Sequence, residues 1–214
     1  MALKNALFEV EFRCQFDSPD DAYQALPFMR SCLHRQFIWN GTFFGLEIFQ
    51  SGRLLRITDA VEGEDTQSYI GWKEPDIGTF ANIRQETVEK ITCGITNSAI
   101  MDFLGGKEHI QNKNEAIQEL ERLGYKRFMS WNGTDLTGYY EPLNINVDLM
   151  SCPMLKWPCL VEMEKMAATE EEASQCESEL YEISCKFQLQ ERIVKEEPPS
   201  LLYARLFGHG SEVD

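Results

Sequence analysis

The stretch Phe8-Glu9-Val10-Glu11-Phe12-Arg13 decides the predicted fold of this chain. In a β-strand successive side chains point to opposite faces, so Glu9, Glu11 and Arg13 would share one face and the apolar residues the other. A similar row, Leu160-Val161-Glu162-Met163-Glu164, recurs late in the sequence and places Glu162 and Glu164 on one face. Charged faces on several strands indicate a closed barrel whose polar side is the inside.

Segments between these two rows carry more charged residues with the same alternation. Gly52 to Thr58 predicts a strand with Arg56 facing inward and Arg53 facing outward. Ser68 to Lys73 predicts the next strand, which stops before Pro75. Asn82 to Cys93 alternates again and places Arg84, Glu86 and Val88 on one face.

Capping and turn signals predict the helices and the remaining strands. Ser18 and Pro19 begin a helix that runs to about Leu33, and Thr169 begins another. Lys113 to Leu123 has helical spacing and ends at Gly124. Arg35 to Phe49 predicts a hairpin that turns at Asn40-Gly41. Three further features complete the prediction: a strand from Tyr125 to about Trp131, a break at Asn132-Gly133-Thr134-Asp135, and a strand from Tyr139 to Asp148, with Asp148 on the face of Asn144 and Asn146. Pro198-Pro199-Ser200 precedes a short C-terminal helix.

Composition limits what such a barrel can be. The chain has 214 residues, of which 43% are hydrophobic and 26% charged, which suits one sizeable domain or two small ones. No linker interrupts it, so we expect a single domain over residues 1–208, with two pseudo-equivalent halves, and a polar tail over residues 209–214. The second half begins after Gly105-Gly106.

Charge and cysteine content narrow the function and the compartment. The formal net charge of −15 argues against general nucleic-acid binding, which needs a basic face. No leader pattern or membrane span is apparent, so we expect a cytoplasmic protein without membrane contact. The seven cysteines lack C-x-x-C spacing, which favours free thiols over disulfides or a zinc site.

Taken in order, the charged motifs resemble the CYTH or triphosphate tunnel metalloenzyme family. They span nearly the whole chain: Glu9-x-Glu11-x-Arg13, Leu55-Arg56-Ile57, Lys73-Glu74-Pro75, Arg84-Gln85-Glu86, Leu123-Gly124-Tyr125, Asp148, Glu162-Met163-Glu164 and Ser200-Leu201-Leu202-Tyr203. The resemblance implies an α+β fold, with a closed eight-stranded antiparallel β-barrel that forms a triphosphate tunnel and with peripheral helices. The family includes class IV adenylyl cyclases, thiamine triphosphatases, inorganic triphosphatases and RNA triphosphatases.

The resemblance also implies which residues form the site. Arginine and lysine suit phosphate oxygens, and Mg²⁺ or Mn²⁺ prefers carboxylate oxygens and water. The expected catalytic residues are Glu9, Glu11 and Arg13. The expected substrate-binding residues are Arg13, Arg56, Lys73, Arg84, Lys126 and Arg127. The expected metal ligands are Glu9, Glu11, Glu86, Asp148, Glu162 and Glu164.

The function expected from this resemblance is metal-dependent hydrolysis of inorganic tripolyphosphate, thiamine triphosphate or a nucleoside triphosphate. Two alternatives stay open. One is a class IV-like adenylyl cyclase that makes cyclic AMP from ATP, and the other is a non-catalytic protein that binds a nucleotide or polyphosphate. The expected partner is a small-molecule triphosphate or nucleotide, and a homodimer is left open.

Two positions depart from the family pattern. Arg13 stands where the family usually has lysine, and arginine stays charged in proteins, so it cannot accept a proton. On the strand after Gly124, the family's lysine and arginine give way to Phe128-Met129-Ser130-Trp131-Asn132-Gly133. Either Lys126 or Arg127, but not both, would point inward on a regular strand, so one tunnel wall could be under-charged. For Trp72, Trp131 and Trp157 we expect packing on the barrel exterior rather than stacking on a ligand.

Overall fold

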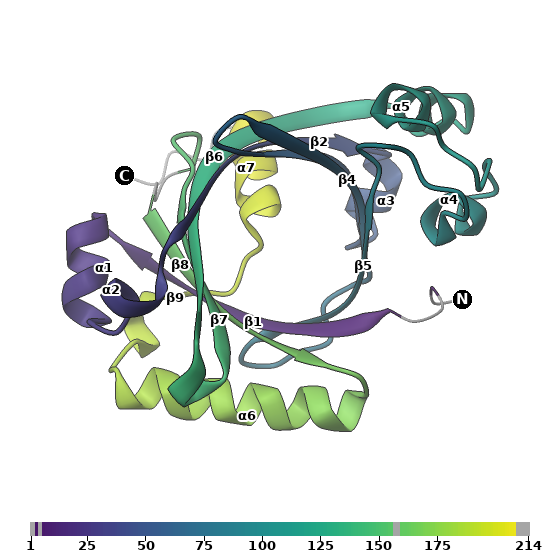
Figure 1. The fold of residues 1–214 in the computed structure, drawn as a ribbon. Helices are drawn as coiled ribbons and strands as arrows, with labels where there is room; N and C mark the ends of the chain where they lie inside the picture. The colour runs from purple at the N-terminus through teal and green to yellow at the C-terminus, as the bar shows by residue number, and fades with distance from the viewer. Residues whose placement is uncertain (1–2, 4–5, 156–158, 209–214) are drawn as a thin grey trace.

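The first strand closes the barrel because it pairs along both of its edges. In this computed structural model, which describes residues 3, 6–155 and 159–208, β1 (Leu7–Phe16) pairs antiparallel with β8 (Cys159–Ala167) and with β5 (Asn82–Lys90). The neighbours run in the order β5-β4-β3-β2-β6-β7-β8-β1, all antiparallel, so the predicted eight-stranded closed barrel is confirmed (Figure 1). The remaining strands are β2 (Arg35–Phe44), β3 (Leu54–Glu62), β4 (Asp65–Lys73), β6 (Arg127–Tyr140), β7 (Ile145–Ser151) and β9 (Ile193–Val194), which adds to β1 beyond β5.

The helices lie around this barrel, as predicted. They are α1 (Pro19–Ala25), α2 (Met29–Cys32), α3 (Leu46–Gln50), α4 (Ala99–Phe103), α5 (Lys113–Arg122), α6 (Glu170–Lys186) and α7 (Pro198–Phe207), with 3₁₀ turns at Glu141–Leu143 and Gln190–Arg192. The predicted caps are present: the side chains of Ser18 and Thr169 accept backbone N–H bonds, and Gly124 has a φ of 95° after α5. The helix predicted from Ser18 to Leu33 is in two pieces because Pro27 interrupts it.

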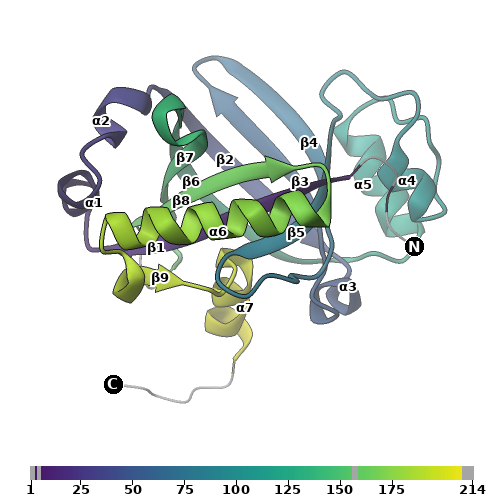
Figure 2. The ribbon, with the colours of Figure 1, turned by 90° about the horizontal axis from the view of Figure 1, so that it is seen from below.

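Alternation along the strands separates an apolar exterior from a charged interior. The apolar residues of β1, including Val10 and Phe12, are buried beneath α6 together with Leu180 and Ile183 (Figure 2). On another side, α4 and α5 cover Leu55, Ile57, Ile70 and Trp72. The helices therefore cover the outward faces of the strands and leave the inward faces to form a cavity. Trp72 lies in this exterior core, as expected.

One end of the barrel interior is filled by apolar side chains. Phe43, Leu54, Met129 and Leu160 alternate with outward-facing residues of their strands and form one cluster with Leu202 of α7. Both ribbon views place α7 at this end of the barrel (Figures 1 and 2). The predicted C-terminal helix begins at Pro198 and Pro199 rather than after them, because proline is favoured in the first helical turn.

Two predicted turns are wrong, and both contain Asn-Gly. Strand β2 runs straight through Asn40-Gly41, and β6 runs straight through Asn132-Gly133. The pairing sets Asn40 opposite Asn132. A Cβ atom on Gly41 would lie 2.3 Å from Trp131 Nε1, and one on Gly133 would lie 2.5 Å from Trp39 Cζ2. Each glycine thus makes room for the indole of the opposite strand. Within a strand, glycine often marks such a close approach rather than a turn.

The remaining expectations concern the cysteines, membrane-spanning helices and the C-terminal tail. Cysteines 14, 32, 93, 152, 159, 176 and 185 are free thiols, of which Cys93 and Cys185 are exposed. Among the described residues, no helix is both long enough and apolar enough to cross a membrane. Trp157 and the predicted tail over residues 209–214 lie outside the described residues.

Candidate functional site

A cavity of about 370 Å³ occupies the barrel interior between the strands. Its charged lining residues come from β1, β3, β4, β6, β7 and β8 and from the residue before α7. They are the acids Glu9, Glu11, Asp135, Asp148, Glu162, Glu164 and Glu197 and the bases Arg13, Arg56 and Lys73. Acidic and basic residues from distant parts of the sequence thus converge on one enclosed space, as predicted from the charged rows at residues 8–13 and 160–164.

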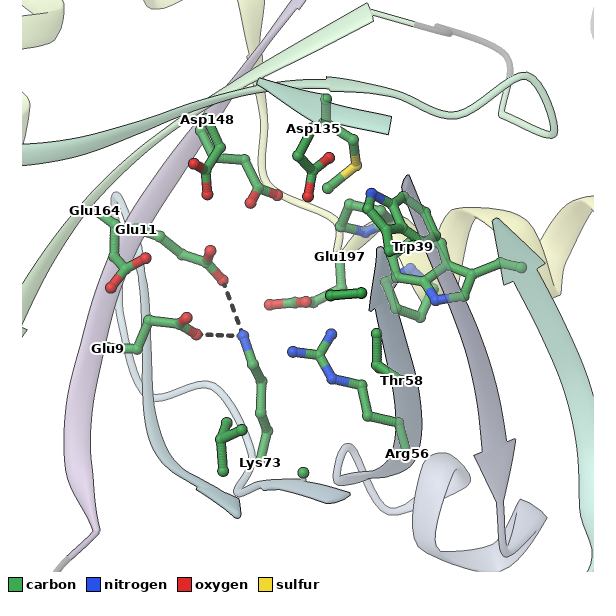
Figure 3. Close-up of a pocket in the computed structure, with 18 of the residues that line it drawn as sticks. Glu9, Glu11, Trp39, Arg56, Thr58, Lys73, Asp135, Asp148, Glu164 and Glu197 are labelled. Carbon is green, nitrogen blue, oxygen red and sulfur yellow. Dashed lines mark hydrogen bonds and ion pairs between the residues drawn. The ribbon is translucent and has the colours of Figure 1, made fainter. Parts of the chain in front are cut away.

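The ammonium group of Lys73 lies at the centre of one group of acids. Figure 3 shows it directed at Glu9 and Glu11, and it donates a hydrogen bond to Glu9. Its Nζ is 3.6 Å from Glu11 Oε1 and 3.7 Å from Glu86 Oε2. Burial alone would lower the pKa of Lys73, but these carboxylates raise it well above its ordinary value. Lys73 is therefore a fixed positive charge and not a proton acceptor.

Arg13 lies at the centre of a second group of acids and is only 2% exposed. Its guanidinium pairs with Glu11, lies 2.5 Å from Glu162 and 3.3 Å from Glu197, and bonds Asn82 at 2.9 Å. Burial opposes the charge, yet the three carboxylates raise the pKa of Arg13 further above its ordinary value. The predicted inward position of Arg13 is confirmed, and the protein itself accepts four hydrogen bonds from the five N–H donors of this guanidinium.

Glu197 was not identified from the sequence, although it lines the cavity. It precedes α7, is 5% exposed, and lies 3.2 Å from Arg84 Nε. Burial raises its pKa, but Arg13, Lys73 and Arg84 together lower it to about 2. An ionised carboxylate thus occupies a position among the basic groups. The sequence shows only an acid directly before the two prolines that start a helix. Because Glu197 does not lie in a strand, alternation could not predict that its side chain points inward.

Several acids of the cavity have too little positive charge nearby. Burial raises the pKa of Asp148 to about 8, with Glu162 adding to the effect, and raises that of Glu164 to about 9, with Glu9 adding to it. Burial also raises the pKa of Glu9 to about 7 and that of Glu162 to about 6, against the opposing Lys73 and Arg13 respectively. Within the described part of the chain Asp148 and Glu164 form no ion pair. These two carboxyls therefore lack a compensating base in the cavity.

The other predicted substrate-binding residues, and the predicted metal ligand Glu86, occupy three kinds of position relative to the cavity. Arg56 lines the cavity and contacts Glu86 at 3.2 Å, whereas Arg84 and Glu86 lie directly behind the lining and contact its residues. Lys126 and Arg127 do not line the cavity. Arg127 is half exposed and bonds Glu121, and Lys126 is exposed at the start of β6. The prediction that one of these two points inward is wrong: β6 starts at Arg127, its pairing with β2 shifts register between Phe43 and Phe44, and the residues of β6 that line the cavity are Trp131 and Asp135.

The part of the cavity wall formed by β2 and β6, where Lys126 or Arg127 was expected, is aromatic instead. Trp39 and Trp131 line the cavity with their ring centroids 4.4 Å apart. Phe37, Met150 and Thr58 lie beside them, and Asp135 is the one acid on this wall. The expectation that Trp131 packs outside the barrel is wrong, and Trp39 and Asp135 were not identified at all. Both errors follow from the supposed turns at the two Asn-Gly pairs, which hid the alternation of β2 and β6.

The donor set suits a divalent metal ion in its chemistry. Oxygen ligands from carboxylates are what Mg²⁺ and Mn²⁺ prefer, and Asp148 and Glu164 carry no compensating base. In the conformation described here, no three acidic, histidine or cysteine side chains of the described residues are grouped closely enough to hold an ion. Glu9 and Glu11 are instead bound to Lys73 and Arg13, so metal binding would require them to exchange a basic partner for the ion.

Solved structures share this fold at low sequence identity. The PH1819 protein from Pyrococcus horikoshii OT3 superposes with a TM-score of 0.71 and 17% identity, covering 92% of this chain and 99% of that one. A candidate adenylate cyclase from Vibrio parahaemolyticus has a TM-score of 0.65 and 15% identity over 93% and 99% of the two chains. HpAC1 from Hippeastrum, described as a candidate adenylyl cyclase with a dominant triphosphatase activity, has a TM-score of 0.58 and 12% identity over 93% and 96%.

The sequence comparisons give no match for this chain. Neither a protein-family model nor a curated protein sequence matches it. The structural likeness extends over nearly the whole chain, and it covers nearly the whole length of each neighbour. The chain therefore has the closed-barrel fold that its motifs predicted through their resemblance to the CYTH proteins.

Proposed function

We propose that this protein is a metal-dependent hydrolase of a triphosphate bound inside the barrel. One observation carries the proposal: Arg13, Arg56 and Lys73 face the same enclosed cavity as a surplus of carboxylates. A triphosphate needs basic groups along its length, and a metal ion needs acids, so the pair would use both kinds of residue.

The charge balance of the cavity makes the metal an essential part of the proposal. Seven acids and three bases line the space, so a bare triphosphate would be repelled by the acids. A bound divalent cation would compensate these acids and supply a water activated for attack on the terminal phosphorus. Glu9, Glu11, Asp148, Glu162 and Glu164 are the proposed ligands, with Glu86 behind them.

The bases have a separate task in this proposal. Arg13 and Lys73 are held in their charged forms and would position phosphate oxygens and stabilise charge that develops during transfer. Arg56 would do the same on the side of Glu197. None of these groups would accept a proton, so the protein's acids would take any proton that the attacking water releases.

A second function, non-catalytic binding, is favoured by a specific observation. Lys126 and Arg127 lie outside the cavity, and Glu197 is already paired with Arg13 and Arg84. Such a site would hold a nucleotide or polyphosphate with too few free bases to stabilise the transition state. The adenylyl cyclase alternative shares the cavity and differs only in its product.

A substrate panel tests these alternatives. Purified protein is incubated with tripolyphosphate, thiamine triphosphate and ATP, with Mg²⁺ and Mn²⁺ in separate reactions, and the products are identified. Release of phosphate supports the hydrolase, and cyclic AMP with pyrophosphate supports the cyclase. Tight binding without products supports the binding protein. A folded protein that neither binds nor changes any of the three contradicts the proposal.

A further inference from the structure

The cavity has two chemically different walls. Strands β1, β7 and β8 contribute Arg13 and five acids, and β4 contributes Lys73. The five acids of this charged wall are Glu9, Glu11, Asp148, Glu162 and Glu164. We call the other side the aromatic wall; it consists of Phe37, Trp39, Thr58, Trp131, Asp135 and Met150, from β2, β3, β6 and β7. In Figure 3 Trp39 and Thr58 lie on the side of the cavity away from Glu9 and Glu164. A ligand made only of phosphate would leave the aromatic wall without contacts.

Four buried polar atoms on the aromatic wall have no hydrogen-bond partner of normal geometry in the described chain, although the Trp39 side chain is near enough to Asp135 to oppose the effect of burial, which raises the pKa of that carboxyl to about 7. They are the indole nitrogens of Trp39 and Trp131, the hydroxyl of Thr58 and Oδ1 of Asp135. Trp39 and Trp131 are 5% and 6% exposed, and an indole nitrogen can only donate. A buried polar atom without a partner is costly, so the indole N–H groups are expected to meet an acceptor in a bound ligand, and Asp135 Oδ1 is expected to meet a donor.

The two indoles are also held in place before any ligand binds. Trp39 lies opposite Gly133 and Trp131 lies opposite Gly41 across the β2–β6 pairing. The space above each glycine is filled by the indole of the other strand, and the two rings lie at 52° to each other. A rigid aromatic surface of this kind loses little conformational entropy when a flat ring packs on it.

We propose that the aromatic wall is a subsite for an aromatic heterocycle that carries hydrogen-bond acceptors, so that the ligand is a phosphate ester of such a ring and not an inorganic polyphosphate. The inference rests on the proposed binding of phosphates by the charged wall. Trp39 and Trp131 would contact the ring and donate to its acceptors, and Thr58 and Asp135 would bind its polar substituents. A nucleobase and the ring system of thiamine both have this chemistry.

Calorimetric titration with diphosphates tests the proposal, because diphosphates match the charged wall without being triphosphate substrates. ADP, thiamine diphosphate and pyrophosphate are compared in the presence of Mg²⁺. Stacking contributes roughly 1–3 kcal/mol per base, so the preferred organic diphosphate should bind about tenfold more tightly than pyrophosphate. Whether ADP or thiamine diphosphate binds more tightly identifies the ring.

Variants locate the preference on the two indoles. Trp39→Leu and Trp131→Leu should each lower affinity for the preferred organic diphosphate about tenfold and leave pyrophosphate affinity unchanged. Trp39→Phe and Trp131→Phe keep a ring and the fold, and should lose about two- to tenfold through the missing donor. Trp72→Phe is the matched control: Trp72 lies outside the barrel and donates to Glu74, so this variant should keep the full preference.

The outcomes separate this inference from the proposed function. Hydrolysis of triphosphates together with equal affinities for all three diphosphates would overturn the subsite and keep the hydrolase. Selective binding that depends on Trp39 and Trp131, without any turnover, would keep the subsite and reject the hydrolase. Absence of binding by a folded protein would overturn the subsite as well.

Discussion

Arg13 and Glu162 stand directly opposite each other in the β1–β8 pairing, and the guanidinium Nε lies 2.5 Å from the carboxylate. This contact joins the charged row near the start of the sequence to the charged row at residues 160–164. It also shows how the cavity compensates its own charges: the bases proposed to hold phosphate are paired with the acids proposed to hold metal.

Removing Arg13 should strongly destabilise the protein. Arg13→Met would leave Glu11, Glu162 and Glu197 buried without their shared partner, and loss of one member of a buried ion pair costs about 3–5 kcal/mol. Urea unfolding measures the change in the free energy of unfolding. Arg35→Met is the control, because Arg35 and Glu62 are paired at the surface, and it should change stability little. Equal effects of both changes would refute the central position of Arg13.

The pair Glu9 and Glu11 should be essential to metal-dependent activity. In Glu9→Gln, Glu11→Gln two carboxylates become neutral amides of similar shape, so activity with Mg²⁺ or Mn²⁺ should fall below detection. Phosphate release from the best substrate of the panel is the measurement. Glu62→Gln serves as the control because Glu62 is exposed and lies outside the cavity lining. Survival of activity in the double variant would show that our metal ligands are wrong.

Mutating Glu197 should separate stability from ligand affinity. Glu197→Gln removes a charge that holds Arg13 and Arg84, so stability should fall by about 2 kcal/mol, as for a hydrogen bond to a charged group. The same change frees positive charge, so affinity for tripolyphosphate should rise severalfold. Calorimetry and urea unfolding measure the two effects. The neighbouring exposed acid gives the control, Glu196→Gln, which should alter neither. Weaker tripolyphosphate binding by Glu197→Gln would contradict competition between this carboxylate and phosphate.

The ligand-free protein should be more stable at pH 6 than at pH 8.5. A carboxyl whose pKa is higher in the folded than in the unfolded state binds its proton more tightly when folded, so its contribution is lost as pH rises through the folded pKa. The ordinary values of 4.5 for Glu and 3.8 for Asp rise to about 7 for Glu9, about 8 for Asp148 and about 9 for Glu164. The loss therefore extends from about pH 5 to pH 9. Glu197, whose pKa is lowered, acts only below this window.

Thermal unfolding across this pH range measures the effect. Combining Asp148→Asn with Glu164→Gln removes two of the titrating groups, so the Tm should depend less on pH and should rise at pH 8.5. Mg²⁺ should also raise the Tm most at high pH, where the acids are ionised. A Tm that increases from pH 6 to pH 8.5 without metal would contradict the excess of acids in the cavity.

Alternation made much of this fold and site predictable. Glu9, Glu11 and Arg13, and likewise Glu162 and Glu164, belong to uninterrupted strands in which they alternate with apolar residues, so their alternation predicted the inward face. The aromatic wall could not be read in this way. Asn-Gly is a strong turn signal, but Gly41 and Gly133 lie within strands because each faces an indole that only the tertiary structure brings there. Glu197 comes from an irregular segment, whose side-chain direction depends on where α7 packs.

Anomalous diffraction from crystals grown with Mn²⁺ and tripolyphosphate is the most direct test of the central claim, that one cavity holds a metal ion and a polyphosphate together. We predict a manganese peak within the barrel, ligated by carboxylates from the set Glu9, Glu11, Asp148, Glu162 and Glu164, with phosphate oxygens on Arg13, Arg56 or Lys73. Manganese and phosphate bound only at the outer surface, with the cavity unchanged, would contradict it.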